Sequence, residues 1–418
     1  MKKTMIGIVV GILIQTSVYA VTATSSVVGY ETNFFDSYAN EVISGKKTIQ
    51  PLQNENWMKT FGGWKYDAGI SVQQTTDGGF VIVGATKSFG AGSYDVWLIK
   101  TDSTGIKIWD KTFGGPGKDI GSSVKQTTDS GYIITGWTSS FGNGSDDVWL
   151  IKTDSEGNKI WDKTFGGTLH DGGNDVEQTT DGGFIIVGDA NNDAGGEGDI
   201  WIIKTDANGN LIWEKEFDGE GTPISHDSGS AIALTSDGGY ILAGGIFTTE
   251  DSYNYNVWLI KIDAEGTMLW NQQFGGADAE FVSSVVQTDD GGFVMVGVDS
   301  YGTADEKLWV IKTDGNGEFL WEQKFAGMGT ARGESVELTS DGGLIIAGFT
   351  YRKFSRYKAF IVKTDENGVR EWSHIFFGGI GNSIAFSAQQ TDDGGYIIAG
   401  ERNVFLNSNV WLIKYYKS

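Results

Sequence analysis

Hydrophobic and polar residues follow one another along the chain in short runs with the period of β-strands. Four such runs are clear between residues 123 and 165. Residues 123–128 are half polar, whereas residues 132–138 are almost continuously apolar, as expected for a strand covered on both faces. Residues 148–153 alternate, and residues 159–165 carry the most charge, which is typical of an edge strand. The pattern predicts four strands and no helix in this segment.

Three sequence anchors recur seven times each, which indicates an internal repeat. The first is an Asp-Gly-Gly or Asp-Ser-Gly turn, found at Asp77, Asp129, Asp181, Asp237, Asp290, Asp341 and Asp393. The second is Trp-Leu-Ile-Lys or a close variant, which begins at Trp97, Trp149, Trp201, Trp258, Trp309, Phe360 and Trp411. The third is a tryptophan before a phenylalanine, found at Trp57, Trp109, Trp161, Trp213, Trp270, Trp321 and Trp372. Successive turns lie 52, 52, 56, 53, 51 and 52 residues apart.

Four-stranded units at this period are typical of radial repetition around an axis. The sequence therefore predicts an all-β fold, a single seven-bladed β-propeller of four-stranded antiparallel blades. The first repeat fragment, residues 57–63, is a fourth strand with no earlier strands before it. The last, residues 411–414, is a third strand with no fourth after it. We expect the N-terminal strand to complete the last blade and close the ring.

The N-terminal residues carry no repeat. Residues 1–20 contain two lysines, an apolar run and a final Val-Tyr-Ala, which predicts a secretory signal peptide. Residues 21–55 are polar and aperiodic and are interpreted as a linker or N-terminal arm, so the propeller occupies residues 56–418. We expect a secreted or cell-surface protein, with no membrane insertion after signal cleavage.

The composition of the chain restricts its binding partners and its chemistry, and it indicates where the core lies. The formal net charge is −23, which disfavours nucleic acids as partners and favours solubility. The chain has no cysteine, so disulfides and thiolate catalysis are excluded. Thirteen of the 15 tryptophans occupy the two repeat positions, so their large side chains are expected to form a core between blades.

The run from Ile151 to Trp161 (IKTDSEGNKIW) resembles the repeat of pyrroloquinoline-quinone-type (quinoprotein-like) propellers. In that family an Asp, a turn Gly and a docking Trp tie adjacent blades together. This chain has one residue fewer between the Asp and the Gly. The longer pattern, over about residues 56–418, is similar to seven-bladed repeats of exported prokaryotic proteins. The resemblance implies a quinone-dependent dehydrogenase with calcium and a catalytic Asp. The family often has a disulfide of adjacent cysteines beside its cofactor, which this chain lacks.

Connection lengths predict that the two faces of the ring differ. Connections between first and second strands, and between third and fourth strands, have constant length and share one face. The opposite, variable face carries the loops between second and third strands and the loops between blades, where binding sites usually lie. Acidic residues occupy the same position on this face in five units: Asp67, Asp119, Asp171, Asp227 and Glu280. We favour hydrogen bonds to the backbone of the neighbouring loops for these carboxylates, with a cation site or a ring that selects cationic ligands as the alternative.

Other candidate binding residues lie in the same loops. His170 and His226 precede Asp171 and Asp227 in the same register, so metal binding or acid–base chemistry is one interpretation and a structural role the other. Tyr253 and Tyr255 lie in the loop of unit four and can stack on sugar rings. Arg352, Lys353 and Arg356 form a basic loop that predicts docking of an acidic partner, with solvated charge as the alternative.

These patterns favour an exported, non-enzymatic propeller that binds a protein or a glycan through the variable face. The alternatives are the quinone-dependent dehydrogenase and a glycan-cleaving enzyme, which needs a positioned pair of carboxylates. No residue is singled out as catalytic. We expect a monomer with no resident cofactor, calcium being the one cation that the acidic positions suggest.

Overall fold

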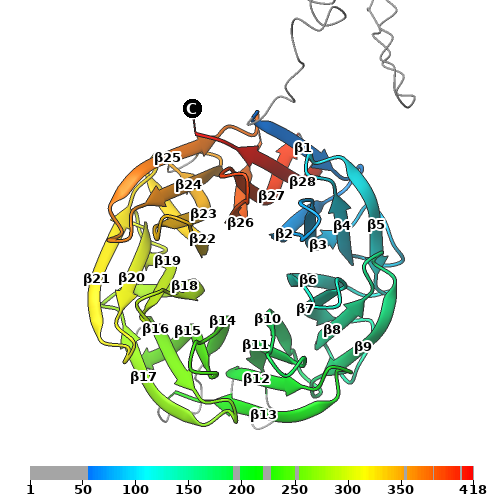
Figure 1. The fold of residues 1–418 in the computed structure, drawn as a ribbon, viewed down its shortest axis with the longest axis horizontal. Coiled ribbons are helices and arrows are strands. Elements are labelled where there is room, and N and C mark those ends of the chain that lie inside the picture. Colours follow the sequence, from blue (N-terminus) through cyan, green and yellow to red (C-terminus); the bar gives the residue numbers. More distant parts are fainter. Residues whose placement is uncertain are drawn as a thin grey trace, which may run out of the picture. The chain divides into compact units, whose positions relative to one another are not determined.

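The computed structural model describes residues 55–191, 198–219, 227–249, 254–352, 355–379, 381–404 and 407–417. They belong to one compact unit, Glu55–Ser418. The signal segment at 1–20 and almost all of the arm at 21–55 lie outside the described residues. Within the described part, 28 strands form seven four-stranded antiparallel sheets around an axis, and no helix occurs (Figure 1). The predicted seven-bladed β-propeller is confirmed.

Each blade contributes one strand to each of four concentric positions. The innermost strands are β2 (Asp67–Gln74), β6 (Asp119–Gln126), β10 (Gly172–Gln178), β14 (Ser228–Leu234), β18 (Ala279–Gln287), β22 (Thr330–Leu338) and β26 (Ser383–Gln390). The second strands are β3 (Phe80–Thr86), β7 (Tyr132–Thr138), β11 (Phe184–Ala190), β15 (Tyr240–Thr249), β19 (Phe293–Tyr301), β23 (Leu344–Tyr351) and β27 (Tyr396–Val404).

The third and fourth positions form the outer half of each blade. The third strands are β4 (Asp95–Thr101), β8 (Asp147–Thr153), β12 (Asp199–Thr205), β16 (Asn254–Ile262), β20 (Lys307–Thr313), β24 (Lys358–Thr364) and β28 (Asn407–Tyr415). The outermost strands are β5 (Lys107–Phe113), β9 (Lys159–Phe165), β13 (Leu211–Phe217), β17 (Met268–Phe274), β21 (Phe319–Phe325), β25 (Arg370–Phe376) and β1 (Trp57–Phe61). We number the blades by chain order, so blade 1 is β2–β5 and blade 7 is β26–β28 with β1.

The strand predictions agree closely with the structure, apart from the inner strand. The segments predicted at 132–138 and 159–165 are β7 and β9. The strand predicted at 123–128 begins earlier, at Asp119, because Asp119 already pairs with Thr138 at the end of β7. The five acidic positions of the variable face therefore lie at or beside the first residues of inner strands and not in free loops.

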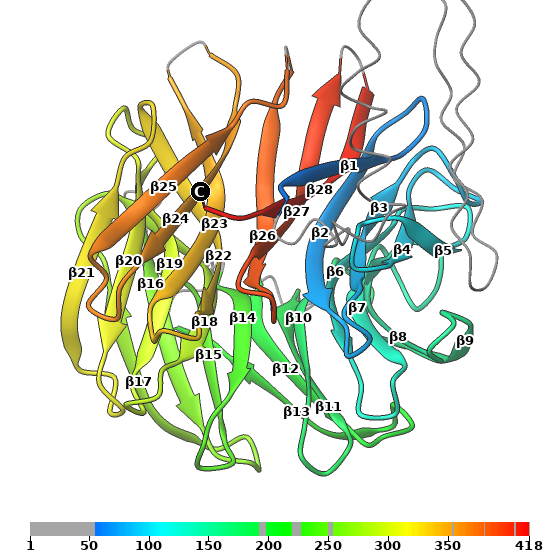
Figure 2. The same cartoon turned by 45° about the horizontal axis from the view of Figure 1, so that its top comes forward.

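The ring is closed by its N-terminal strand. β1 pairs antiparallel with β28, from Trp57 opposite Lys414 to Phe61 opposite Val410. Figures 1 and 2 show β1 lying along the outer edge of the blade formed by β26, β27 and β28. The predicted closure is confirmed, and it leaves blade 7 with the same four strands as the other blades.

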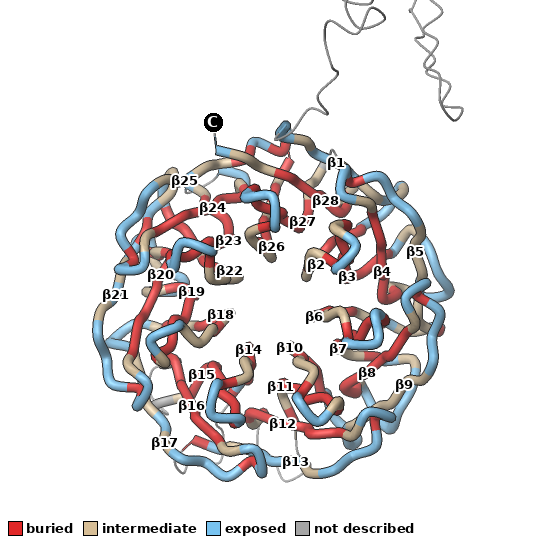
Figure 3. Tube along the Cα trace, viewed as in Figure 1, coloured by how far each residue is buried: buried red, intermediate tan, exposed pale blue. Residues whose placement is uncertain are grey.

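The hydrophobic core lies between blades. One cluster joins Ile133 and Leu150 of blade 2 to Ile186 and Trp201 of blade 3. An equivalent cluster joins blade 7 to blade 1 across the closure. In Figure 3 the buried residues follow the middle strands of every blade, whereas the outermost strands are mostly exposed. No single sheet can bury both faces by itself, so the ring is stable only as a closed set of neighbours.

The docking tryptophans explain why each third-to-fourth turn contains a glycine. Gly157 has a φ of +75°, and a methyl group added there would lie 2.6 Å from the ring of Trp109 in the preceding blade. Only glycine fits such a contact without strain. The same contact recurs in six pairs: Trp57–Gly105, Trp109–Gly157, Trp161–Gly209, Trp213–Gly266, Trp270–Gly317 and Trp321–Gly368. The seventh tryptophan, Trp372, packs instead against the rings of Tyr396 and Tyr415.

Candidate binding face

The constant-length turns form a fixed face, and their side chains are used for structure. Asp77 accepts hydrogen bonds from the Thr75 hydroxyl, the Gly79 backbone N–H and the ammonium of Lys100. Lys100 is buried and also donates to the carbonyl of Thr101. The lysine of every third strand is buried in this way: Lys100, Lys152, Lys204, Lys261, Lys312, Lys363 and Lys414. Each Asp–Lys pair therefore links the turn after the first strand of a blade to the end of its third strand.

We expect the protein to lose stability as the pH falls from about 4 to about 2. Burial opposes ionisation of Asp77, but hydrogen bonds from Thr75, Lys100 and Gly79 outweigh it and lower its pKa to about 2. Five equivalents also have a pKa of about 2: Asp129, Asp181, Asp237, Asp290 and Asp341. A carboxyl whose pKa is lowered by folding stabilises the folded state fully at pH values above its pKa in the unfolded chain. This contribution disappears as the pH falls and the carboxyl is protonated.

These carboxylates are half or more exposed, so each pair contributes only about 0.5 kcal/mol, but seven act together. The measurement is the free energy of unfolding by urea at a series of pH values. Asp129→Asn should remove part of the acid dependence, and Glu156→Gln, on an exposed turn residue, should not. A free energy of unfolding that stays constant down to pH about 2 would contradict the expectation.

On the variable face, the repeated acidic residues are buried. Asp67 is inaccessible to solvent. It accepts hydrogen bonds from the hydroxyls of Thr86 and Ser88 and from the backbone N–H of Gly63, at 2.5 to 2.8 Å. Its carboxylate thereby joins the loop before the blade to the end of the second strand. This is the backbone hydrogen bonding that the sequence favoured over a cation site.

The other four acidic positions make related contacts. Asp119 accepts from Gly115, Thr138 and Ser140. Each of the remaining three accepts from the backbone N–H of a glycine in the preceding loop: Asp171 from Gly167, Asp227 from Gly219 and Glu280 from Gly276. Within the described residues no three acidic or histidine side chains come close enough to hold a metal ion. Each of these five carboxylates contacts its own blade or the loop before it.

The structure adds a second acidic position that the sequence analysis did not single out. Asp95, at the start of β4, and Asp119 border the same glycine, Gly114. Asp147 and Asp171 border Gly166 in the same way. Burial raises the pKa of Asp199, the equivalent in blade 3, to about 6, with Asp218, Glu216 and Asp227 adding repulsion. The signal was present as a constant offset of 28 residues from Asp67, Asp119 and Asp171.

The two histidine-aspartate pairs are not both described, because His226 lies outside the described residues. His170 is exposed, and its Nδ1 lies 2.6 Å from a carboxylate oxygen of Asp146. Its ring also packs edge-on against Trp137 at 6.0 Å. These contacts orient His170 on the rim of the face. His374 lies elsewhere, in β25 against Phe376 and Tyr415, and burial lowers its pKa.

The candidate residues of the tyrosine loop and the basic loop differ in how far they are buried. Tyr255 is half-buried, and its ring contacts Phe247 at 5.3 Å and Phe281 at 5.1 Å. Arg352 is exposed, and its Nε donates to the carbonyl of Met328. Arg356 is also exposed. The other candidates from these two loops, Tyr253 and Lys353, lie outside the described residues.

Exposed aromatic side chains gather on the variable face. Trp64, in the loop between β1 and β2, is 90% exposed, and Phe377, after β25, is 68% exposed. Five more exposed aromatics lie in connections on this face or at their edges: Tyr66, Phe89, Phe141, Tyr301 and Tyr357. Among the described residues, the exposed aromatic outside these loops is Phe319, on an outer strand. In the sequence, aromatic residues of these loops that are exposed do not differ from those that pack inside.

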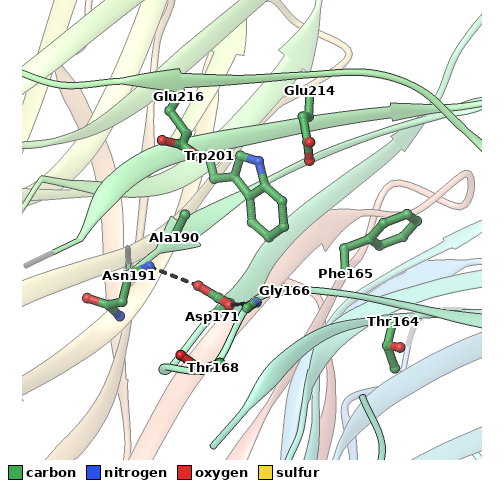
Figure 4. Close-up of a pocket in the computed structure, with 11 residues that line it drawn as sticks. Thr164, Phe165, Gly166, Thr168, Asp171, Ala190, Asn191, Trp201, Glu214 and Glu216 are labelled. Carbon is green, nitrogen blue, oxygen red and sulfur yellow. Dashed lines mark hydrogen bonds between the residues drawn. The ribbon is translucent and has the colours of Figure 1, made fainter. Parts of the chain in front are cut away.

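A pocket of about 450 Å³ opens between blades 2 and 3. Phe165, Asp171, Trp201, Glu214 and Glu216 contribute to its lining. Figure 4 shows the indole of Trp201 in the middle of this group, with both glutamates on one side of it and Asp171 on the other. Asp171 already accepts hydrogen bonds from Gly167 and Asn191. Of the sequence candidates, this pocket contains Asp171.

Charged residues also line the innermost strands. The ammonium of Lys125 lies 2.5 Å from a carboxylate oxygen of Glu177. Burial raises the pKa of Glu177 and of Glu337, while Lys125 opposes the shift in both. Burial also raises the pKa of Glu334, on β22, to about 7. On the inner wall, Glu334 is therefore a carboxyl group that binds a proton near neutral pH.

The fold and its two faces define the class of protein, a seven-bladed β-propeller with a structural face and a variable loop face. No family model matches the sequence. The chain is similar to "Regulatory protein FlaEY" of Caulobacter vibrioides (strain ATCC 19089 / CIP 103742 / CB 15), with 26% identity over 200 residues. That match covers 42% of this chain and 20% of the relative, so the chain spans about a fifth of that protein's length.

Two solved structures align with most of this chain. A protein of unknown function from Dyadobacter fermentans DSM 18053 has a TM-score of 0.51 at 12% identity, over 85% of this chain and 98% of that one. Sqt1 from Chaetomium thermophilum has a TM-score of 0.46 at 10% identity, over 83% of both chains. At these identities the first likeness shows the fold alone. In the described part of the chain, no helix has the length and apolar character needed to cross a membrane.

Proposed function

We propose that this protein is an exported, non-enzymatic binding module that holds a protein or a glycan on its variable face. The observation that carries the proposal is the gathering of exposed aromatic side chains there. Aromatic residues expose large rigid surfaces, lose little conformational entropy on binding, and are enriched where proteins contact ligands. Trp64, at 90% exposure, leaves a large apolar surface open to solvent.

The two faces also differ in how their polar groups are used. On the fixed face, the repeated Asp and Lys side chains pair with each other in all seven blades. On the variable face, the buried carboxylates support loops whose outward residues differ from blade to blade. A constant scaffold beneath variable loops is the arrangement that binding proteins use. The partially similar relative is named as a regulatory protein, and that name states no reaction.

The test compares two matched variants of residues 21–418. The first is Trp64→Ala with Phe377→Ala, which removes the two most exposed aromatics of the variable face. The second is Glu156→Ala with Glu265→Ala, which changes two exposed residues of the fixed face. Each immobilised protein is incubated with surface extract of its own organism, and the captured ligand is then titrated in purified form. We expect the aromatic variant to bind at least about tenfold more weakly.

Thermal melting of each variant provides the control, because all four side chains are exposed and neither variant should lose much stability. The fixed-face variant should bind as the unmodified chain does. Loss of binding in the fixed-face variant, with binding retained in the aromatic variant, would mean that the opposite face holds the ligand.

A further inference from the structure

Lysines and aromatic residues gather in the variable-face loops of blade 1, the blade of β2 to β5 in Figure 1. Three connections contribute: residues 62–66 before β2, residues 87–94 between β3 and β4, and residues 114–118 after β5. Their sequences are GGWKY, KSFGAGSY and GGPGK, with three lysines and no acidic residue. The whole chain, by contrast, has 54 acidic and 31 basic residues. We define the blade-1 patch as Trp64, Lys65, Tyr66, Lys87, Tyr94 and Lys118.

Backbone contacts hold the three connections side by side. The N–H of Lys87 donates to the carbonyl of Tyr66 at 2.8 Å. Tyr94 forms a parallel β-bridge with Lys118. The rings of Tyr66 and Tyr94 lie 5.8 Å apart and nearly edge to face, which joins the two pairs. Residues distant in the chain therefore form one surface in which lysines alternate with aromatic rings.

The lysine side chains of the patch are exposed and unpaired. Lys65, Lys87 and Lys118 are exposed, and none of their ammonium groups forms an ion pair or a hydrogen bond with a described residue. The ammonium of Lys87 lies instead 5.1 Å from the centre of the Tyr94 ring. On the outermost strand of the same blade, Lys107 pairs with a carboxylate of its own strand. The patch thus has three ammonium groups available to an anion.

Buried carboxylates lie beneath the patch, but they are bonded to the loops. The oxygens of Asp67 and Asp119 accept from loop N–H groups and hydroxyls. Asp95 accepts from the N–H groups of Ala91 and Gly92. These buried charges offset the lysines at long range, so attraction of an anion depends on direct contact with the ammonium groups. A ligand must bring its negative charge down to the level of the rings.

The neighbouring blade lacks this combination. At the repeat position of Trp64, blade 2 has Pro116. At the position of Tyr94 it has Asp146, whose carboxylate contacts His170. Both blades have the same four strands and the same docking contacts, so the scaffold does not require the residues of the patch. Exposed residues that the scaffold does not require are candidates for ligand binding.

The patch suits a ligand whose negative charge lies on a ring with an apolar face. A uronic acid has both, because its carboxylate is attached to a sugar ring whose C–H groups can stack on the indole of Trp64. The carboxylate can then accept charge-assisted hydrogen bonds from Lys65 or Lys87. An acidic peptide has its carboxylates on flexible stems, which lose more conformational entropy on binding and offer no flat surface to the indole. These differences favour an acidic glycan.

We propose that the blade-1 patch binds a polysaccharide that contains uronic acid. Sugar rings stack on Trp64 and Tyr66, and their carboxylates contact the three lysines of the patch. A polymer presents several carboxylates in succession, so a single chain can contact more than one lysine at once. The proposal names the ligand class for the glycan alternative of the proposed function, and so rests on that function.

The test titrates residues 21–418 with defined oligomers by isothermal titration calorimetry. The probes are hexamers of galacturonate, mannuronate and glucuronate at pH about 7, where their carboxylates are ionised. The methyl ester of the galacturonate hexamer keeps the sugar rings and removes the charge, and hexaglutamate keeps the charge and removes the rings. We expect at least one uronate hexamer to bind with a saturating isotherm. The hexamer's methyl ester and hexaglutamate should bind at least about tenfold more weakly.

Two charge-matched variants complete the design. Lys65→Gln with Lys87→Gln should weaken uronate binding at least about tenfold. Lys159→Gln with Lys215→Gln, on exposed positions of outermost strands, should leave it unchanged. All four side chains are exposed, so both variants should melt as the unmodified chain does.

Several outcomes would overturn the proposal. They are no binding of any uronate hexamer, equal binding of the methyl ester, or equal weakening in both lysine variants. Equal binding of hexaglutamate would replace the glycan by an acidic peptide.

The outcome can be separated from that of the proposed function. The Lys65→Gln, Lys87→Gln variant is also assayed against the ligand captured by the immobilised protein. If no uronate binds while the captured ligand is still lost in the Trp64→Ala, Phe377→Ala variant, the uronate assignment is wrong and the binding face stands. If the captured ligand depends only on the fixed face, the proposed function fails whatever the uronates do.

Discussion

Deletion of residues 21–63 is expected to cause aggregation or a large loss of thermal stability, because it removes the strand that closes the ring. β1 pairs with β28 over five residues, and without it β28 would expose an unpaired edge. The deletion also removes Trp57, which contacts Gly105 of blade 1 and packs against Phe80 at 6.1 Å. Losing a large aromatic from such a contact alone costs about 3–5 kcal/mol. The measurement is the melting temperature and the monomer fraction by size-exclusion chromatography.

Deletion of residues 21–50 is the matched control, because it leaves β1 and all of its contacts in place. We expect this shorter deletion to be nearly neutral. A protein without residues 21–63 that melted within a few degrees of the 21–418 chain and stayed monomeric would refute closure by the N-terminal strand.

Asp119→Ala is expected to destabilise the protein by about 3–5 kcal/mol, although the residue belongs to the candidate binding face. The carboxylate is inaccessible to solvent and accepts hydrogen bonds from Gly115, Thr138 and Ser140. Alanine would leave those donors without an acceptor in a buried place. The free energy of unfolding in urea measures the effect.

Asp119→Asn should have a smaller effect, because the amide keeps one acceptor oxygen. Glu156→Ala, on an exposed turn, should change the free energy of unfolding by no more than about 0.5 kcal/mol. If Asp119→Ala unfolded like the unmodified chain but lost ligand binding, the carboxylate would have to be assigned to the ligand and not to the fold.

The repeat made the architecture readable from the sequence. Strand periodicity, Asp-Gly-Gly turns and docking tryptophans are local patterns, and seven copies of each reinforce one another. The unpaired fragments around Trp57 and Trp411 also predicted the closure, because each lacks the strands that the other supplies. Turn residues such as Asp77 and Gly157 act through neighbours close in sequence or at a fixed repeat offset, so their spacing carries the information.

The candidate sites depended on contacts that spacing does not show. Asp67 and Asp119 have the same spacing whether they hold a cation or a loop, and only the structure shows their oxygens bonded to loop N–H groups and hydroxyls. The sequence places Trp64 outside the two repeat positions, but its exposure is visible only in the structure, because exposure depends on what the adjacent blade covers.

The pocket beside Trp201 is the clearest example of a site that the sequence does not show. The sequence places tryptophan at this position in six blades, with no sign that Trp201 borders a pocket. Whether such an indole borders a pocket depends on residues from several strands, as Trp201 of β12 lies with Phe165 of β9 and Glu214 of β13. The sequence by itself determined the ring and its closure, since these follow from repeated local patterns. Only the tertiary structure decided which polar and aromatic groups remain available to a ligand, since burial is a property of neighbours distant in the chain.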